Sequence, residues 1–230
     1  MRIYRNFKEA YSEVRRDLGE MGILVHTTSY QNKDISGMDE FTTKELQNYT
    51  YQVTNTTGFE TDLKASLPWA EHEFYERLDD CPKNPGDAYL LRHQVWEEFL
   101  NKDRRFDYTY GERLHPCGTN QIKSVIEVLK NDRSSRQAYI SIWDNLDITN
   151  AGGDVRIPCS LGYLFQIRRD KLNITYLQRS SDFVTHFQND VYLACKMQHF
   201  IAGKLNIETG SYTHWIGSLH AFKKDLADVF

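Results

Sequence analysis

Apolar side chains recur at helical spacing near the start of the chain. Phe7, Tyr11, Val14 and Leu18 lie three or four residues apart with charged residues between them, so they share one face of a predicted helix. The polar stretch 25–67, rich in Thr, Asn and Tyr, shows no clear period. It predicts short strands and loops.

Three later segments also predict helices. Residues 69–75 directly follow Pro68, and proline is well suited to the first helical turn. Residues 89–100 form the second such segment. In the third, residues 122–129 place four branched apolar side chains at helical spacing, and a polar Lys-Asn-Asp sequence closes the segment.

After residue 137 the period changes to two. Ala138, Ile140 and Ile142 alternate with other side chains, which is the pattern of a strand. The runs 161–168 and 171–178 have strand-like composition and are separated by only two residues. They therefore predict a β-hairpin.

The last part of the chain predicts one more helix, 190–205, and one more strand, 213–222. The sum is an α+β fold, in which helices pack on a mostly antiparallel or mixed sheet. No internal repeat, low-complexity tract or linker rich in Pro, Gly or Ser divides the sequence. Residues 1–230 are therefore expected to form a single domain.

The composition narrows the class of protein. Of the 230 residues, 40% are apolar and 13% aromatic, which supplies a sizeable core and argues against disorder. Lys and Arg number 28 against 32 Asp and Glu, for a net charge of −4, whereas a protein that coats nucleic acid is usually basic. No run approaches 18 apolar residues, and no cleavable signal precedes the first helix, so we expect a cytoplasmic protein that spans no membrane.

The four cysteines, Cys81, Cys117, Cys159 and Cys195, are far apart in the sequence. No pair has the short spacing of a zinc or redox site, so we expect reduced thiols and no metal. A cysteine within a strand is most often a small buried apolar residue.

Three polar clusters fall at the ends of predicted strands. They are Arg-Ile-Pro-Cys-Ser at 156–160, Gln-Arg-Ser-Ser-Asp at 178–182 and Gly-Ser-Leu-His at 217–220. Strand ends that gather a Cys, an Arg, an Asp and a His commonly build a nucleophile site, and a neighbouring guanidinium lowers the pKa of a thiol. Each cluster alone is also compatible with a salt-bridged turn, a buried thiol or a solvated histidine.

In this order and separation the clusters resemble the thymidylate synthase superfamily, and within it the phage deoxycytidylate hydroxymethylases. Pro158 and Cys159 match the nucleophile dipeptide, with Ser160 where thymidylate synthases usually carry His. Residues 178–182 match the QRSxD motif, and Phe-Gln-Asn-Asp at 187–190 is similar to a hydroxymethylase segment. The resemblance implies a thymidylate-synthase-like fold and a homodimer that packs sheet against sheet.

The resemblance also implies roles for the matched residues. Cys159 would be the nucleophile, and Arg179 and Ser180 would bind the phosphate of a pyrimidine nucleotide. Glu71 would move protons through ordered water, and Tyr110 would help to remove the C5 proton.

Further implied roles concern the sugar, the folate and the partner subunit. His220 would contact the sugar, while Asp182 and Trp96 would hold 5,10-methylenetetrahydrofolate, the expected co-substrate. Arg136 would reach the phosphate in the partner subunit, although the second arginine of the family's pair is replaced by Gln here. Phe222 stands where the family uses a tyrosine hydroxyl on the sugar.

The residue that reads the base decides the substrate. Asp190 stands eight residues after Asp182, where thymidylate synthases usually have an Asn that donates to uracil O4 and accepts from N3–H. An ionised carboxylate only accepts hydrogen bonds, so it suits the 4-amino group of cytosine. A slip of one residue would put Asn189 at this position, and Asp190 could instead cap the following helix.

The expected function is folate-dependent one-carbon transfer to C5 of a pyrimidine nucleotide. Its most specific form is hydroxymethylation of dCMP, in the host cytoplasm if a phage encodes the protein. A short thymidylate synthase acting on dUMP, or a C5-methylase or hydroxymethylase of dCMP or CMP, would use the same chemistry. A different class is an inactive homologue that binds a nucleotide or RNA as a dimer.

Overall fold

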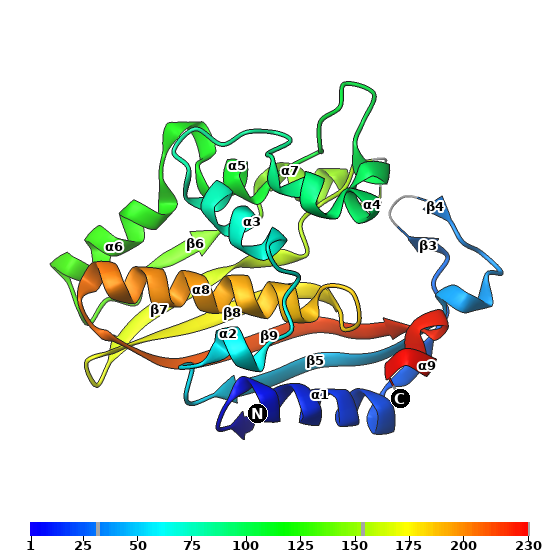
Figure 1. The fold of residues 1–230 in the computed structure, drawn as a ribbon, viewed down its shortest axis with the longest axis horizontal. Coiled ribbons are helices and arrows are strands. Elements are labelled where there is room, and N and C mark those ends of the chain that lie inside the picture. Colours follow the sequence, from blue (N-terminus) through cyan, green and yellow to red (C-terminus); the bar gives the residue numbers. More distant parts are fainter. Residues whose placement is uncertain (31–32, 153–154, 230) are drawn as a thin grey trace.

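The computed structural model describes residues 1–30, 33–152 and 155–229 (Figure 1). The order of strands in its main sheet is β1 (Arg2–Tyr4), β5 (Thr43–Val53), β9 (Glu208–Phe222), β8 (Lys171–Asp182), β7 (Ser160–Arg168) and β6 (Tyr139–Ser141). β2 (Ile23–Val25) also pairs with β5, and β3 (Ser29–Tyr30) pairs with β4 (Lys33–Asp34) in a separate ribbon. β8 is parallel to β9 and β1 to β5, while the other neighbours are antiparallel, so the expectation of a mixed sheet is confirmed.

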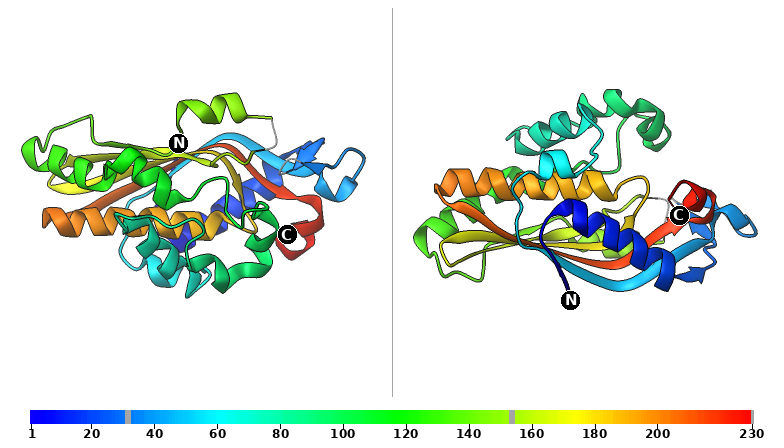
Figure 2. Two further views of the ribbon diagram at one scale, coloured as in Figure 1. Left: turned by 90° about the horizontal axis from the view of Figure 1, so that it is seen from above. Right: turned by 60° about the horizontal axis from the view of Figure 1, so that its bottom comes forward.

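Helices cover the sheet, with α8 lying along one face and α3 beyond it (Figure 1). Their bounds are α1 (Phe7–Met21), α2 (Phe59–Asp62), α3 (Trp69–Leu78), α4 (His93–Trp96), α5 (Tyr110–Leu114), α6 (Gln121–Asn131), α7 (Asn145–Asn150), α8 (Phe187–Leu205) and α9 (Leu226–Val229). α7 lies on the side of the sheet opposite α8 (Figure 2). In the part of the chain that the structure describes, no helix combines the length and apolar character needed to cross a membrane.

Alternate residues of the central strands face α8 and form the core. Tyr176 of β8 stacks between Tyr163 of β7 and His214 of β9, at centroid distances of 4.9 and 4.7 Å. The ring of Tyr51 on β5 lies 5.5 Å from that of His214. All four side chains are buried, and full burial of one large apolar side chain contributes about 1.5–3 kcal/mol to stability.

The chain turns where the local sequence permits it. The β7–β8 hairpin turns at Arg169 and Asp170, whose φ angles are 52° and 56°, as a two-residue type I′ turn requires. After α8, Asn206 takes the left-handed conformation (φ 53°) that commonly ends a helix. Because α8 links two parallel strands, the carboxyl ends of β8 and β9 meet at one edge of the sheet.

Four of the predicted helices, at 7–18, 69–75, 122–129 and 190–205, are confirmed as α1, α3, α6 and α8. Two other predictions were wrong. Part of the stretch 25–67 forms β5, an 11-residue strand inside the sheet, whose alternation is interrupted at Asn48 (φ 51°). The segment 89–100 is split into short turns, η2 (Ala88–Arg92), α4 and η3 (Glu97–Phe99), because Arg92 has non-helical angles of φ −140° and ψ 37°.

Candidate active site

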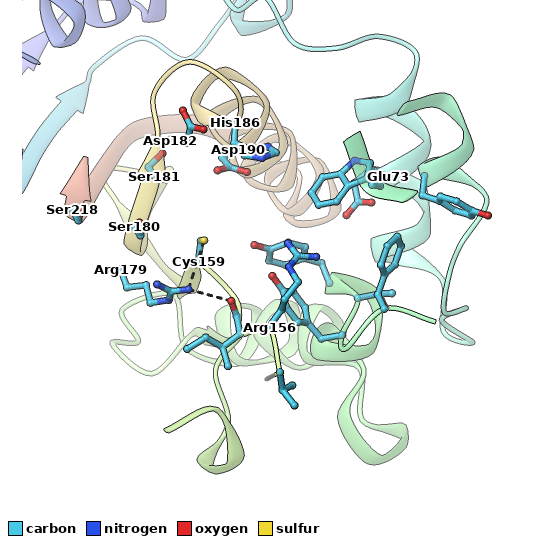
Figure 3. Close-up of a pocket in the computed structure, with 18 of the residues that line it drawn as sticks. Glu73, Arg156, Cys159, Arg179, Ser180, Ser181, Asp182, His186, Asp190 and Ser218 are labelled. Atoms are coloured by element: carbon cyan, nitrogen blue, oxygen red, sulfur yellow. Dashed lines mark hydrogen bonds between the residues drawn. The ribbon is translucent and has the colours of Figure 1, made fainter. Parts of the chain in front are cut away.

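A cavity of about 480 Å³ opens where β8 and β9 end and α8 begins. Its walls bring together the three polar clusters of the sequence, represented by Cys159, Arg179 and His220. Figure 3 shows the guanidinium of Arg179 beside Cys159, with residues 180–182 following on the same strand, Asp190 at the start of α8 and Glu73 on the opposite wall. Eight of the ten residues predicted for the site line this cavity: Trp96, Tyr110, Cys159, Arg179, Ser180, Asp182, Asp190 and His220.

Arg179 organises the loop that carries the cysteine. Its Nε donates to the carbonyl of Pro158 at 2.9 Å and an NH2 nitrogen donates to the carbonyl of Ile157 at 3.2 Å. The same NH2 nitrogen lies 3.9 Å from Sγ of Cys159. Burial raises the pKa of the Cys159 thiol and the charge of Arg179 lowers it, and burial has the larger effect. The guanidinium alone therefore does not convert this thiol to a thiolate in the free protein.

Tyr110 is tied to the residue after the cysteine. Its hydroxyl lies 3.1 Å from Oγ of Ser160, which in turn lies 2.6 Å from the hydroxyl of Tyr176. The guanidinium of Arg77 sits 4.1 Å from the centroid of the Tyr110 ring. Burial raises the pKa of Tyr110 well above its ordinary value, so Tyr110 is a neutral phenol that can relay a proton but is not itself a phenolate base.

Asp190, rather than Asn189, faces the cavity. Oδ2 of Asp190 accepts a hydrogen bond from Nε2 of Gln178 at 2.9 Å. Asn189 is turned away, because its Oδ1 accepts from the backbone N–H of Ser66 at 2.7 Å. The residue before α8 is His186, so Asp190 is not the cap of this helix. Burial raises the pKa of Asp190, and the hydrogen bond from Gln178 acts in the opposite direction.

Asp182 and His220 are neighbours across the parallel strands β8 and β9. Oδ1 of Asp182 accepts from the backbone N–H groups of Val184 and Thr185 at 3.0 and 3.2 Å. Nδ1 of His220 lies 3.4 Å from the carbonyl of Ser218. Burial lowers the pKa of His220, so a neutral imidazole faces the cavity at neutral pH.

Aromatic rings form one wall of the cavity. Trp96 stacks on Trp69 with centroids 6.2 Å apart and an interplanar angle of 24°. The rings of His186 and Phe106 lie 5.5 and 6.3 Å from that of Trp96. This wall offers a broad apolar surface for a flat ligand.

Residues 69–229, more than half of the chain, match the family described as thymidylate synthase. The chain belongs to the thymidylate synthase family. A putative thymidylate synthase of Methanothermobacter marburgensis is 36% identical over 136 residues, which are 58% of this chain and 59% of that protein. The thymidylate synthase of Staphylococcus haemolyticus is 25% identical over 148 residues, 64% of this chain and 42% of that protein. The chain therefore aligns with less than two thirds of the length of these two relatives.

Solved thymidylate synthase structures share the fold. Thermostable thymidylate synthase A from Bacillus subtilis has a TM-score of 0.73 at 18% identity, and the match covers 97% of this chain and 82% of that chain. Thymidylate synthase from T4 phage has a TM-score of 0.72 at 20% identity, covering 95% and 78% of the two chains. The predicted fold class is thereby confirmed.

The structure places Glu71 and Glu73 on different sides of α3. Glu71 is not among the residues that line the cavity. Its carboxylate binds Lys196 and the hydroxyl of Tyr192 on α8. Glu73 lines the cavity instead, and its Oε1 accepts from Nε of Arg77 at 2.9 Å. Residues two apart on a helix point to different sides, so both carboxylates cannot serve one cavity.

Arg136 is exposed and lies outside this cavity. Its expected action on a partner subunit stays a prediction. The structure adds three cations to the cavity wall that the sequence did not predict there, Arg77, Lys83 and Arg156. The guanidinium of Arg156 lies 4.0 Å from the ring of Phe99. The four-residue spacing of Trp69, Glu73 and Arg77 was the signal that could have placed Arg77 there.

No three His, Cys, Asp or Glu side chains of the described ranges gather where they could hold a metal ion.

Proposed function

We propose that this protein is a cytoplasmic enzyme that transfers a one-carbon unit to C5 of a pyrimidine nucleotide, and that its substrate is dCMP, which it hydroxymethylates. Membership of the thymidylate synthase family supports the reaction class. The observation that carries the choice of base is the position of Asp190. Of Asn189 and Asp190, only Asp190 lines the cavity, and a carboxylate accepts from the 4-amino group of cytosine.

The nucleotide would lie across the ends of β8 and β9. Arg179 carries the positive charge for the phosphate, and Ser180 beside it offers a hydroxyl. His220, on the neighbouring strand, can bind a sugar hydroxyl as a neutral imidazole. This orientation brings the base to Asp190 and to Cys159, which face each other across the cavity (Figure 3).

Cys159 would start the reaction by adding Sγ to C6 of the pyrimidine. The electron pair of the C5–C6 double bond then moves to C5, which becomes nucleophilic. The thiol must first lose its proton, because burial raises the pKa of Cys159 in the free protein. Arg179, 3.9 Å from the sulfur, favours the thiolate. Expulsion of Sγ from C6 at the end regenerates the enzyme.

The aromatic wall fits 5,10-methylenetetrahydrofolate, which would supply the one-carbon unit when bound. Trp69 and Trp96 present nearly parallel rings for a flat pterin. Asp182 lines the cavity, and Oδ1 makes the hydrogen bonds to the following turn. The other oxygen, Oδ2, is available to accept from ring N–H groups.

Glu73 would take the role that the resemblance gave to Glu71. Its carboxylate lines the cavity and is held through Oε1 by Arg77, which leaves Oε2 for a water molecule. Deprotonation of that water would complete the reaction as a hydroxymethyl group, with the proton passing to Glu73. Tyr110, hydrogen-bonded to Ser160, would orient the group that receives the C5 proton.

The active form would be a homodimer joined through the sheet. The face opposite α8 carries half-buried Leu164, Leu177 and Trp215, and α7 on the same side exposes 67% of Leu146 and 70% of Ile148. Such a surface fits a second apolar surface. Arg136 of the partner subunit would then add a cation for the phosphate.

A second candidate is a short thymidylate synthase that methylates dUMP. The name of the Methanothermobacter marburgensis relative, 36% identical, favours it. An inactive nucleotide-binding or RNA-binding homologue is less well supported, because Cys159, Arg179, Asp182 and His220 all line one cavity.

One assay separates these functions. The protein is incubated with 5,10-methylenetetrahydrofolate and either dCMP or dUMP tritiated at C5, and the tritium released to water is counted. Release from dCMP with a hydroxymethylated product supports the proposal. Preferential release from dUMP with dTMP as product supports the second candidate, and no release from either nucleotide supports an inactive homologue.

A further inference from the structure

A chain of buried hydrogen bonds runs from Asp190 into the core of the sheet. Nε2 of Gln178 donates to Oδ2 of Asp190 at 2.9 Å, and Oε1 of Gln178 lies 2.8 Å from Nε2 of His214. Nδ1 of His214 lies 3.2 Å from the hydroxyl of Tyr51. Gln178 and His214 are both 0% exposed, so their hydrogen bonds are made within the protein.

The ionised carboxylate of Asp190 determines which group donates and which accepts in each of these hydrogen bonds. An ionised Asp190 only accepts, so the amide nitrogen of Gln178 must face it and the amide oxygen must face His214. His214 must then carry its proton on Nε2, and Nδ1 accepts from the hydroxyl of Tyr51. Burial lowers the pKa of His214 to about 3, so its ring carries a single proton and cannot donate from both nitrogens.

With the hydrogen bonds in this direction, one oxygen of Asp190 remains available for a ligand. The hydrogen bond from Gln178 is the only one that the described residues give to the carboxylate, and it occupies Oδ2. Oδ1 therefore remains for the base. Burial raises the pKa of Asp190, whereas the charge of His186 and the hydrogen bond from Gln178 favour the carboxylate. Loss of this bond would free the carboxyl group to rotate or to take up a proton, and a protonated oxygen can donate to uracil O4.

We propose that Gln178 and His214 are positioning residues that set the base specificity of the site, by holding Asp190 as an ionised acceptor with Oδ1 toward the 4-amino group of cytosine. This inference rests on the proposed function. Neither Gln178 nor His214 is among the residues that line the cavity. Gln178 acts on Asp190 directly, and His214 acts by fixing the orientation of the Gln178 amide.

The test compares kcat/KM for dCMP and for dUMP in wild type and in Gln178→Met. Methionine keeps the volume of the side chain and removes the donor to Asp190. The dCMP to dUMP ratio should fall about tenfold, the effect of one charge-assisted hydrogen bond. His214→Phe keeps the stacked ring and removes the Nε2 donor, so the ratio should fall in the same direction by a smaller factor. If Gln178→Met does not fold, His214→Phe provides the test.

Gln198→Met is the matched control. Gln198 is also fully buried, but its Nε2 donates to the carbonyls of Leu172 and Ser211 away from the cavity. This substitution should lower stability and leave the ratio unchanged. A purely structural role for Gln178 would likewise lower both kcat/KM values equally, and that result would overturn the proposal.

A double mutant separates the positioning role of Gln178 from the recognition of cytosine by Asp190. In the background of Asp190→Ala, Gln178→Met should no longer change the ratio, because no carboxyl or amide group remains for Gln178 to hold. An undiminished effect in that background would overturn the proposal while cytosine recognition by Asp190 stands. If Asp190→Asn itself leaves the ratio unchanged, the cytidylate function fails, and this inference fails with it.

Discussion

Glu71 and Glu73 are two carboxylates on one helix for which the structure predicts opposite consequences of the same substitution. Glu73→Gln removes the group that would accept a proton inside the cavity. Glu71→Gln changes a carboxylate that binds Lys196 and Tyr192 outside it. The two variants differ by two residues in position and are identical in chemistry, so each is the control for the other.

The expected magnitudes follow from the surroundings of each carboxylate. Loss of a positioned acid or base costs about 10²–10⁴-fold in rate, so Glu73→Gln should reduce kcat by that factor. It also leaves the guanidinium of Arg77, 5% exposed, without its counter-charge. The Gln oxygen can still accept from Nε, so we expect a loss of roughly 1–3 kcal/mol in the free energy of unfolding. Glu71 is 31% exposed in its ion pair with Lys196, and such partly solvated pairs contribute about 1 kcal/mol or less.

The assay is tritium release from C5 together with urea denaturation of each variant. Glu71→Gln should keep activity close to that of wild type, and Glu73→Gln should lose it while remaining folded. The opposite result, with activity lost in Glu71→Gln and kept in Glu73→Gln, would refute the assignment of Glu73 and restore the position expected from the family.

Four further predictions test the site and the assembly. Cys159→Ala should abolish turnover and keep nucleotide binding, whereas Cys117→Ala, at an exposed position, should remain active; survival of activity in Cys159→Ala would exclude it as the nucleophile. Asp190→Asn replaces the acceptor for the 4-amino group of cytosine by an amide that donates to uracil O4 and accepts from N3–H; at about 1–3 kcal/mol for each hydrogen bond, the dCMP to dUMP ratio should fall about 10²–10⁴-fold, and a wild type that prefers dUMP would contradict this. Light scattering at micromolar concentration should give the mass of a dimer, and a monomeric mass would count against the sheet interface. The pKa of His214 is lowered to about 3, so stability should fall as the pH drops below about 6.5, by up to about 1.4 kcal/mol per unit; urea midpoints at pH 7 and pH 5 should differ less in His214→Phe than in wild type.

The sequence predicted the elements whose pattern is local. Helices α1, α3 and α6 each bury one stripe of side chains, and α8 is a long helix that is buried on most sides. The hairpin turn at Arg169 and Asp170 is only two residues long. β5 escaped prediction because Asn48 interrupts its alternation and because it is recognised as a strand only through pairing with β9. That pairing is a long-range property, and a window of sequence does not contain it.

The candidate site was predictable where motifs lie on strands and less so where a helix sets the direction of a side chain. Residues 178–182 and 217–220 lie on neighbouring strands, so they meet once the sheet forms. Glu71 and Glu73 are equivalent in composition, and only the packing of α3 determines which of them enters the cavity. The pKa of the Cys159 thiol was also only partly predictable. The motif showed that Arg179 would be close to the thiol, but the sequence did not show that burial has the stronger effect on the pKa of Cys159.

The parallel pairing of β8 and β9 makes the length of these strands part of the site. Ser180 lies opposite Ser218, and Asp182 lies opposite His220. One residue inserted earlier in either strand would turn every later side chain to the other face of the sheet and would separate these pairs. In relatives, insertions and deletions should therefore be absent from residues 174–182 and 212–220 and should occur in segments such as 25–42. Transplanting this site into another protein would require both strands at their full length, in addition to the motif residues.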